Sequence, residues 1–245
     1  MKKIFFKKRI PEPQEMTIAE QKEFEKISRA NYKKWMIPLI DDLSNYLKIK
    51  SEILKILDVG SGPGLLSKEL SIRFPKAKIT GIDISKYSIK LAKKNCKGIK
   101  NINFIVADVK NLPFSDNYFD IVVCKDSFHQ FSNPIKAIKE IYRVLKPKGI
   151  IYLQDLRRNV PFYLIKMILP PDTLAKAKKL IYYSARSSYL PEEIKKILNK
   201  AGIKKFILKG RKLTNKLKNK YQKIGIDINS LKHTLSSRLI LIIKK

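Results

Sequence analysis

Three glycines at alternate positions, Gly60, Gly62 and Gly64, constrain the fold of this chain more than any other feature. They follow an apolar run at residues 54–59 that is typical of a buried strand. The next residues, 65–74, carry apolar side chains at helical spacing. Glycine can turn without a Cβ penalty and lets a ligand lie directly against the backbone. A strand, a glycine-rich turn and a helix N-terminus together predict a pocket for a nucleotide-like ligand.

The succession of strand and helix repeats through the middle of the chain. Ser85 and Asn133 stand where N-caps of the intervening helices are expected, and Pro134 would open the second of these helices. Further strands are expected at 77–83, 102–107, 121–124 and 150–153. Strands that alternate with helices predict an α/β fold, in which a parallel sheet has helices on both faces.

The glycine spacing distinguishes two kinds of nucleotide site. A dinucleotide fingerprint needs a glycine three residues after Gly62, where this chain has Leu65. The chain instead has Asp58 followed by Gly60-x-Gly62-x-Gly64, which resembles motif I of the class I S-adenosylmethionine-dependent methyltransferases. In that family the loop packs under the methionine and ribose parts of the cofactor. The alternative is a tight strand-to-helix turn that binds no ligand.

Two further carboxylates follow at the ends of expected strands. Asp83 ends the second strand, where a carboxylate can accept hydrogen bonds from both ribose hydroxyls. Asp108 ends the third, where similar proteins place an acidic residue near the adenine amino group. Each aspartate alone is as readily a turn or helix-capping residue. The resemblance therefore implies that S-adenosylmethionine binds to Asp58, Gly60, Ser61, Gly62, Gly64, Asp83, Ile84, Asp108, Val109 and Lys125.

The chain is most similar to the broad group that includes quinone-biosynthesis and other small-molecule C- and O-methyltransferases. The resemblance is strong over 53–155 and weak over 190–209, with Lys148 where such proteins often have glycine. It implies a Rossmann-like, seven-stranded, mostly parallel sheet in one domain, 1–245. We expect four parts: an N-terminal helical cap (1–52), a cofactor-binding core (53–155), a lid insertion (156–189), and a C-terminal helix with the last two strands (190–245).

The loop after the fourth strand is the expected catalytic segment. In an open α/β sheet, ligands bind beyond the C-terminal strand ends, which is where this loop would lie. His129 can act as a general base with a pKa near the working pH, and Asp126 can orient it or act alone. The alternative is that His129 only packs against the cofactor. Methyl transfer from a sulfonium depends mainly on alignment, so a base is not required.

Specificity is expected from the segments outside the core pattern. Tyr32 and Trp35 belong to an apolar helical pattern at 17–48 that would fold over the substrate, or clamp to the sheet. Arg157 and Arg158 follow the fifth strand and can grip a carboxylate or phosphate bidentately, or form structural ion pairs with Asp155 and its neighbours.

The formal net charge of +32 raises the question of a polyanionic partner. Residues 156–245 carry 23 lysines and arginines against four acidic residues, which would suit RNA or another polyanion. Composition bias is the alternative, because lysines occur along the whole chain. An RNA methyltransferase is therefore the second hypothesis, although no Asn/Asp-Pro-Pro-Tyr/Phe motif follows the fourth strand. A third is a non-catalytic accessory protein that binds S-adenosylmethionine.

Location and redox state follow from what the sequence contains. Cys96 and Cys124 lie on different expected elements, and without a secretory signal they indicate reduced thiols in a cytoplasmic protein. We expect a lid helix at 160–169, whose apolar and basic character would suit peripheral contact with a membrane and a lipid-soluble substrate such as a quinone. No metal site is expected, and the sequence pattern predicts no oligomeric state.

Overall fold

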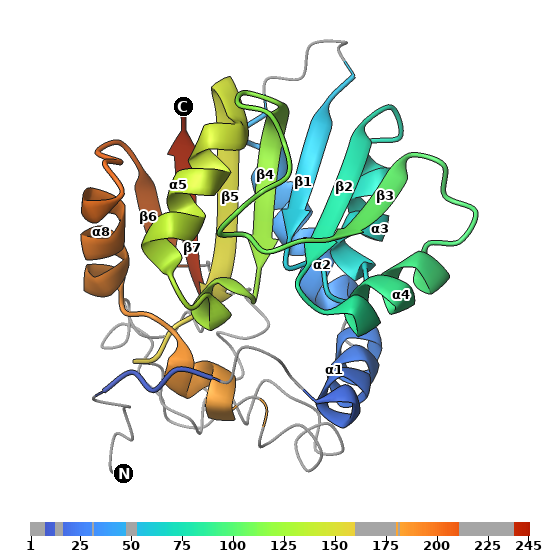
Figure 1. Cartoon of the computed structure of the whole chain (residues 1–245), viewed down its shortest axis with the longest axis horizontal. Helices are drawn as coiled ribbons and strands as arrows, with labels where there is room; N and C mark the ends of the chain where they lie inside the picture. The colour runs from blue at the N-terminus through green and yellow to red at the C-terminus, as the bar shows by residue number, and fades with distance from the viewer. Residues whose placement is uncertain are drawn as a thin grey trace, which may run out of the picture.

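A single seven-stranded sheet forms the centre of the molecule (Figure 1). The structure, a computed structural model, describes residues 8–12, 17–30, 32–47, 53–159, 180, 182–210 and 238–245. The strands are β1 (Lys55–Val59), β2 (Lys78–Asp83), β3 (Ile102–Val106), β4 (Phe119–Lys125), β5 (Leu145–Leu156), β6 (Ile207–Gly210) and β7 (Arg238–Lys244). The helices are α1 (Ile18–Ala30), α2 (Tyr32–Ser44), α3 (Leu65–Arg73), α4 (Lys86–Asn95), α5 (Pro134–Val144) and α8 (Pro191–Lys200), with a 3₁₀ turn, η1, at Phe128–Gln130.

The strand order is β3-β2-β1-β4-β5-β7-β6. Strands β1 to β5 pair in parallel, whereas β7 runs antiparallel between β5 and β6. Successive strands are added on one side of β1 as far as β3 and on its other side from β4 onward. The C-terminal ends of β1 and β4 therefore form the crevice where α/β proteins bind ligands. The expected seven-stranded, mostly parallel α/β sheet is confirmed.

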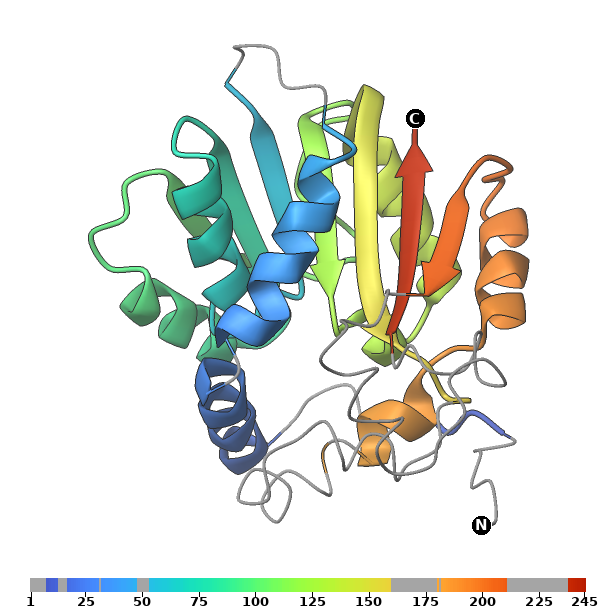
Figure 2. The ribbon, with the colours of Figure 1, turned by 180° about the vertical axis from the view of Figure 1, so that it is seen from behind.

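Helices cover both faces of this sheet, as Figures 1 and 2 show. On one face, Ile138 and Ile141 of α5 and Leu198 of α8 pack in a cluster with Val122 and Leu153. On the other face, α2 and α3 bury a second cluster against the strands, including Leu39, Leu43, Leu70, Val123 and Tyr152. Both faces of the central strands are buried, which explains their nearly continuous apolar runs.

The helix starts agree with the expected caps. Ser85 Oγ accepts a hydrogen bond from the Ser88 amide at 3.2 Å, and Asn133 Oδ1 accepts one from the Lys136 amide at 3.0 Å. Strand β5 is much longer than expected, because its last residues continue to pair with β7 as far as Leu156. The apolar pattern predicts the sixth strand at 203–209, but β6 begins four residues later, at Ile207.

Three segments lie at the C-terminal ends of the parallel strands: α1, residues 8–12 and the helical residues 182–187 (Figure 1). The apolar pattern at 17–48 is thus divided between α1 in this position and α2 on the sheet. The expected lid helix at 160–169 and residues 211–237 of the basic C-terminal half lie outside the described residues. Of the helices that the structure describes, none is long and apolar enough to cross a membrane.

Candidate functional site

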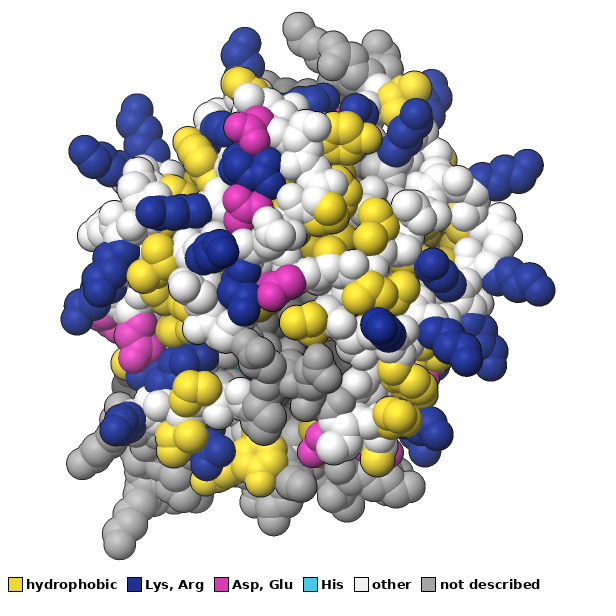
Figure 3. All heavy atoms as spheres, viewed as in Figure 1, with side chains coloured by type: hydrophobic (Ala, Val, Ile, Leu, Met, Phe, Trp, Pro, Cys, Tyr) yellow, Lys and Arg dark blue, Asp and Glu magenta, His cyan; other side chains and the backbone are white. Residues whose placement is uncertain are grey.

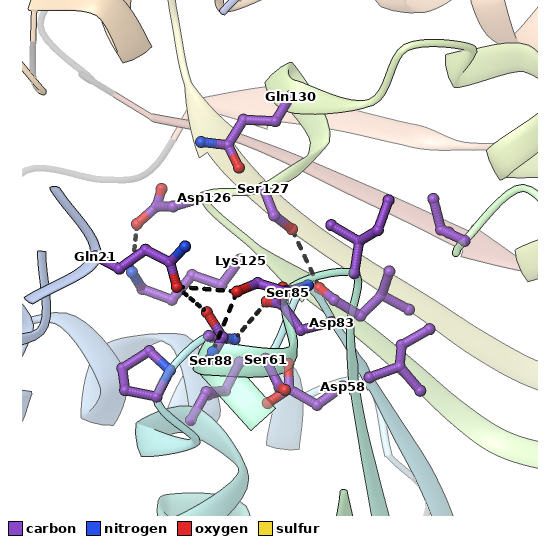
Figure 4. Close-up of a pocket in the computed structure, with 18 of the residues that line it drawn as sticks. Gln21, Asp58, Ser61, Asp83, Ser85, Ser88, Lys125, Asp126, Ser127 and Gln130 are labelled. Carbon is purple, nitrogen blue, oxygen red and sulfur yellow. Dashed lines mark hydrogen bonds and ion pairs between the residues drawn. The ribbon is translucent and has the colours of Figure 1, made fainter. Parts of the chain in front are cut away.

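A cavity of about 240 Å³ lies at the C-terminal ends of β1, β2 and β4. Its walls come from the β1–α3 turn, the end of β2 and the loops after β3 and β4, with α1 and residues 8–12 as further contributors. Figure 4 shows Asp58, Ser61 and Asp83 on one side and Asp126 and Gln130 on the other. The sheet topology therefore brings together residues that are far apart in the sequence.

The glycine turn forms the floor of this cavity. Gly60, Gly62 and Gly64 have φ values of 69°, 50° and 78°, in the left-handed region that favours glycine. A Cβ on Gly60 would lie 2.3 Å from Ser127 Oγ, so the close approach of β1 and the β4 loop requires glycine there. The hydroxyl of Ser61 is buried and has no hydrogen-bond partner among the described residues. The turn thus offers bare backbone and a buried polar group to a ligand.

The carboxylate of Asp83 is held by two backbone amides, one from the glycine turn and one from the start of α4. Its Oδ2 accepts a hydrogen bond from the Gly62 amide and its Oδ1 one from the Ser85 amide, each at 2.9 Å. Burial raises the pKa of Asp83, against the opposing effect of these amides. The carboxylate lines the cavity and can accept further hydrogen bonds from a pair of hydroxyls.

Asp58 is the most deeply buried acid of the site, with 1% exposure. Its Oδ2 accepts a hydrogen bond of 2.6 Å from Ser67 Oγ on α3. Burial, together with the nearby negative charge of Asp83, raises the pKa of Asp58 to about 7, although the hydrogen bond from Ser67 and the charge of Lys125 lower it. The protonation of Asp58 is therefore sensitive to any charged ligand that reaches this wall.

The wall beyond β2 and β3 can accept a flat ring. Ile84 is 41% exposed and Val109 is buried, and both line the cavity. Asp108 Oδ1 accepts a hydrogen bond from the Lys110 amide at 2.9 Å, and its Oδ2 lies 3.4 Å from Lys110 Nζ. Apolar edges beside a carboxylate suit a ring with an exocyclic amino group.

Helix α1 is tied to this wall by Gln21. Its Oε1 accepts hydrogen bonds from Ser85 Oγ at 2.9 Å and Ser88 Oγ at 3.1 Å (Figure 4). Gln21 was not expected from the sequence, because the contact joins residues more than 60 positions apart. It places α1 over the cavity beside Asp83.

His129, in the loop after β4, pairs with Asp155 near the end of β5. His129 Nδ1 lies 2.7 Å from Asp155 Oδ1, and the His129 amide donates to Asp155 Oδ2 at 2.8 Å. Both side chains are buried. Burial alone would lower the pKa of His129, but the charge and hydrogen bond of Asp155, with a contribution from Glu12, raise it.

The sequence suggested Asp126, not Asp155, as the partner of His129. Asp126 instead forms ion pairs with Lys125 and Arg238, and its backbone has a φ of 55°. The positive φ turns the chain at the end of β4, while Asp155 reaches His129 from the end of the neighbouring β5. Lys125 and Asp126 still line the cavity.

The two arginines after β5 are engaged away from the cavity. The buried Arg158 donates to the Ser188 carbonyl at 2.6 Å and pairs with both carboxylate oxygens of Glu193, at 2.6 and 2.9 Å. Arg157 Nε donates to Asn159 Oδ1 at 3.1 Å. Neither arginine is among the described residues that line the cavity, so the geometry favours the structural alternative, with Glu193 as partner.

The remaining expectations have mixed outcomes. Tyr32 and Trp35 lie on α2, but their side chains are outside what the structure describes, whereas Met36 of the same helix lines the cavity. Cys96 and Cys124 are both free and buried. The described residues contain no group of three or more His, Cys, Asp or Glu residues that could hold a metal ion.

Residues 8–12 contribute two site residues that sequence reasoning missed. Glu12 lines the cavity, and Arg9 donates to the carbonyls of Ser187 at 2.6 Å and His129 at 2.7 Å. The segment has no periodic pattern, and both contacts span more than 100 positions. No local signal could have identified them.

A family model described as "Methyltransferase domain" matches residues 50–202. A demethylmenaquinone methyltransferase of Thermotoga maritima is 34% identical over 119 residues, which are 49% of this chain and 45% of that protein. The Chlorobaculum tepidum protein of the same name is 33% identical over 167 residues, 62% of this chain and 66% of that one. The chain thus spans less than two thirds of the length of these curated relatives.

Solved structures show the same fold. A SAM-dependent methyltransferase from Aquifex aeolicus superposes with a TM-score of 0.63 at 19% identity and covers 94% of this chain and 98% of its own. The plantazolicin methyltransferase BpumL, in complex with SAH, gives a TM-score of 0.64 at 26% identity and covers 92% and 93%.

Proposed function

Because the chain belongs to the methyltransferase-domain family, we propose that it transfers a methyl group from S-adenosylmethionine to a small-molecule acceptor. The observation that carries the proposal is Asp83 held by Gly62 and Ser85 beside three glycines of positive φ. This arrangement leaves a carboxylate and bare backbone facing one cavity. Those are the groups that a ribose with an attached amino acid requires.

The residues of the cavity fit the whole cofactor. Asp83 would accept hydrogen bonds from the ribose hydroxyls, and Ile84 and Val109 would pack against the adenine, with Asp108 near its amino group. Asp58, Ser61 and the glycine turn would hold the methionine part, with Lys125 at the same end of the sheet. When bound, the cofactor would supply a methyl group on a sulfonium sulfur, and the sulfur would leave as a neutral thioether in the in-line displacement.

The chain's own contribution is mainly alignment. The acceptor would occupy the side of the cavity formed by Glu12, His129, Gln130 and Phe131, opposite Asp58 and Asp83. Residues 8–12 line that side through Glu12, whereas α1 lines the side of Asp83 through Gln21. Correct placement of two reactants can supply about 7–11 kcal/mol of barrier reduction, more than any one side chain.

His129 would act on the acceptor through Nε2, because Nδ1 is occupied by Asp155. A histidine with a raised pKa keeps its proton to higher pH than a free histidine. We therefore propose that His129 donates a hydrogen bond and stabilises negative charge on the acceptor, and that it acts as a general base only at higher pH.

The small-molecule reading is supported by the size of the cavity and by the relatives, which are named for demethylmenaquinone. RNA is the second candidate acceptor, on the charge of the C-terminal half. On the face shown in Figure 3, Lys and Arg side chains are spread over the surface of the described residues. The size of the cavity and the names of the relatives therefore carry the choice of a small molecule.

Methyl-labelled S-adenosylmethionine tests the proposal. The purified chain is incubated with the label and a cell extract, which is then separated into small-molecule, RNA and protein fractions. We expect label in the small-molecule fraction, and none there with the Asp83→Ala variant as control. Label that collects in RNA would replace the proposal by the RNA hypothesis, and no transfer to any fraction would favour an accessory protein.

A further inference from the structure

Two neighbouring side chains on the acceptor side of the cavity carry buried polar atoms that lack partners. Glu12 Oε2 accepts a hydrogen bond from Gln130 Nε2 at 2.9 Å, but Glu12 Oε1 has no hydrogen-bond partner among the described residues. His129 Nε2 is equally buried and has none in the described part of the chain. It lies 3.9 Å from Glu12 Oε2, beyond hydrogen-bonding distance. Buried polar atoms without partners are costly, and at a cavity wall they indicate a ligand group.

The position of Glu12 is fixed by its surroundings. The side chain is only 9% exposed, although residues 8–12 form no helix or strand. Arg9 of the same segment donates to the Ser187 and His129 carbonyls, and its guanidinium lies 4.2 Å from the centre of the Tyr189 ring. The Ile10 amide donates to the Arg186 carbonyl at 3.3 Å. These contacts hold Glu12 against the cavity.

We propose that Glu12 and His129 together bind a hydroxyl group of the methyl acceptor, which donates to Glu12 Oε1 and accepts from the Nε2–H of His129. The inference rests on the proposed function and adds the acceptor's chemical class to it. Glu12 would be a substrate-binding residue, and Asp155 a positioning residue that acts through His129.

The donor and acceptor pattern selects this group. Asp155 and Glu12 flank the imidazole with negative charge and favour its protonated form, whereas burial and the nearby Arg9 oppose it. The protonated ring can only donate from Nε2, and the carboxylate of Glu12 can only accept. An ammonium only donates, an ether only accepts, and a carboxylate would meet the charge of Glu12. A hydroxyl does both.

A fragment panel tests the hydroxyl preference with the full chain and SAH. The probes are phenol and benzyl alcohol, their methyl ethers, and benzylammonium, titrated by ligand-observed NMR. We expect each hydroxyl compound to bind at least about tenfold more tightly than its ether. Glu12→Gln should abolish that preference, and Glu23→Gln, which changes a glutamate on α1 paired with Lys26, should keep it.

Three outcomes would overturn the inference. They are no preference for hydroxyl over ether in the wild type, a preference that persists in Glu12→Gln, and tighter binding of benzylammonium that depends on Glu12. SAH affinity is measured for each variant in the same experiment. Normal SAH binding without hydroxyl preference defeats only this inference, whereas an absence of SAH binding to the wild type defeats the proposed function.

A second readout needs no acceptor. The chain has two histidines, so the ring signals of His129 can be assigned with a His129→Asn variant and followed against pH by NMR. Because the charge of Glu12 helps to raise the pKa of His129, Glu12→Gln should lower that pKa and Glu23→Gln should leave it unchanged. Equal His129 pKa values in both variants would show that Glu12 does not face the ring.

Discussion

At the scale of single residues, two aspartates at the ends of neighbouring strands have different environments. Asp83 is only partly buried and accepts two backbone hydrogen bonds, so it can remain charged beside a ligand. Asp58 is buried and accepts a hydrogen bond from the hydroxyl of Ser67. Burial raises the pKa of both carboxyl groups, and it raises that of Asp58 to about 7.

Asp58→Asn should flatten the dependence of stability on pH. A carboxyl whose pKa rises on folding, here from 3.8 to about 7, stabilises the native state while it is protonated. That contribution is complete below the unfolded pKa and disappears as the pH rises to about 7, a loss of at most about 4 kcal/mol. Denaturant unfolding between about pH 4 and pH 7 measures it.

In the wild type, the free energy of unfolding should fall over this range more steeply than in Asp58→Asn. Asp116→Asn removes the same charge at a site with a 68% exposed side chain and should retain the wild-type slope. Equal slopes in all three proteins would refute the account of Asp58.

Asp155→Asn should lower the pKa of His129. The Asp155 carboxylate outweighs the burial of the imidazole, and the amide of asparagine cannot replace its charge. In the wild type, the stabilisation from this pair is complete below the unfolded pKa and is lost as the pH rises through the folded value. NMR titration of His129 measures the change. As the pH rises, methyl transfer should begin to decline at a lower pH in the variant than in the wild type.

An unchanged His129 titration in Asp155→Asn would contradict the assigned pair. Asp126→Asn is the matched comparison, because Asp126 pairs with Lys125 and Arg238 instead of with His129. If Asp126→Asn shifts the His129 pKa more than Asp155→Asn does, the original sequence hypothesis holds and the structural one is wrong.

The residues that the sequence predicted are those whose roles depend on local geometry. Gly60 is the first positive-φ residue of the glycine turn, and Ser85 caps the helix that begins at the next residue, so both act within a few positions. Glu12, Gln21 and Asp155 act across distances of 26 to 118 positions. Their contacts depend on strand order and on where α1 and residues 8–12 pack, which no local pattern encodes.

At the scale of elements, the β1–α3 turn is the most tightly constrained connection. Gly60→Ala should destabilise the protein because a Cβ would lie 2.3 Å from Ser127 Oγ and 2.5 Å from Ser127 Cβ. The positive φ adds about 1–2 kcal/mol to this clash. Thermal unfolding of the variant measures the loss of stability, and SAH titration measures the loss of affinity that follows from a distorted turn.

Gly98 provides a control for the cost of a positive φ without a steric clash. It has a φ of +86°, and a Cβ there would meet nothing within 4 Å. Gly98→Ala should therefore cost less stability than Gly60→Ala and leave SAH affinity unchanged. Equal costs for the two substitutions would show that Ser127 moves aside and that the turn is not tightly packed.

The end of β5 is attached to α8 by the ion pair of Arg158 and Glu193. Glu193→Gln should destabilise the protein by about 1–2 kcal/mol, because it removes the negative charge that the partly exposed Glu193 offers to the buried guanidinium of Arg158. Glu192→Gln, the adjacent residue on α8, should have little effect. Chemical denaturation measures both, and SAH affinity should be unchanged in each.

A contrary result would restore the substrate role that the sequence suggested for Arg158. If Glu193→Gln is as stable as Glu192→Gln while methyl transfer weakens, the arginine serves the acceptor and not the fold. The sequence could not decide this, because Glu193 lies 35 positions from Arg158 on an element whose packing depends on the complete sheet.

At the scale of the whole molecule, the fold was largely predictable and its edges were not. Alternating strand and helix patterns at 54–153 predict the parallel core, because each buried strand pattern is followed by a helical one. The extension of β5 to Leu156 and the late start of β6 depend on pairing with β7. The net charge of +32 likewise specifies no partner, because charge without placement describes solubility and nonspecific attraction.

The central claim is that the cavity at the ends of β1 and β2 is a cofactor site. Calorimetric titration with SAH tests this claim most directly. The wild type should bind SAH at one site, and Asp83→Ala should weaken binding by about 100-fold or more while it still unfolds cooperatively. If the wild type does not bind SAH, or if folded Asp83→Ala binds it equally well, the cofactor site proposed here is wrong.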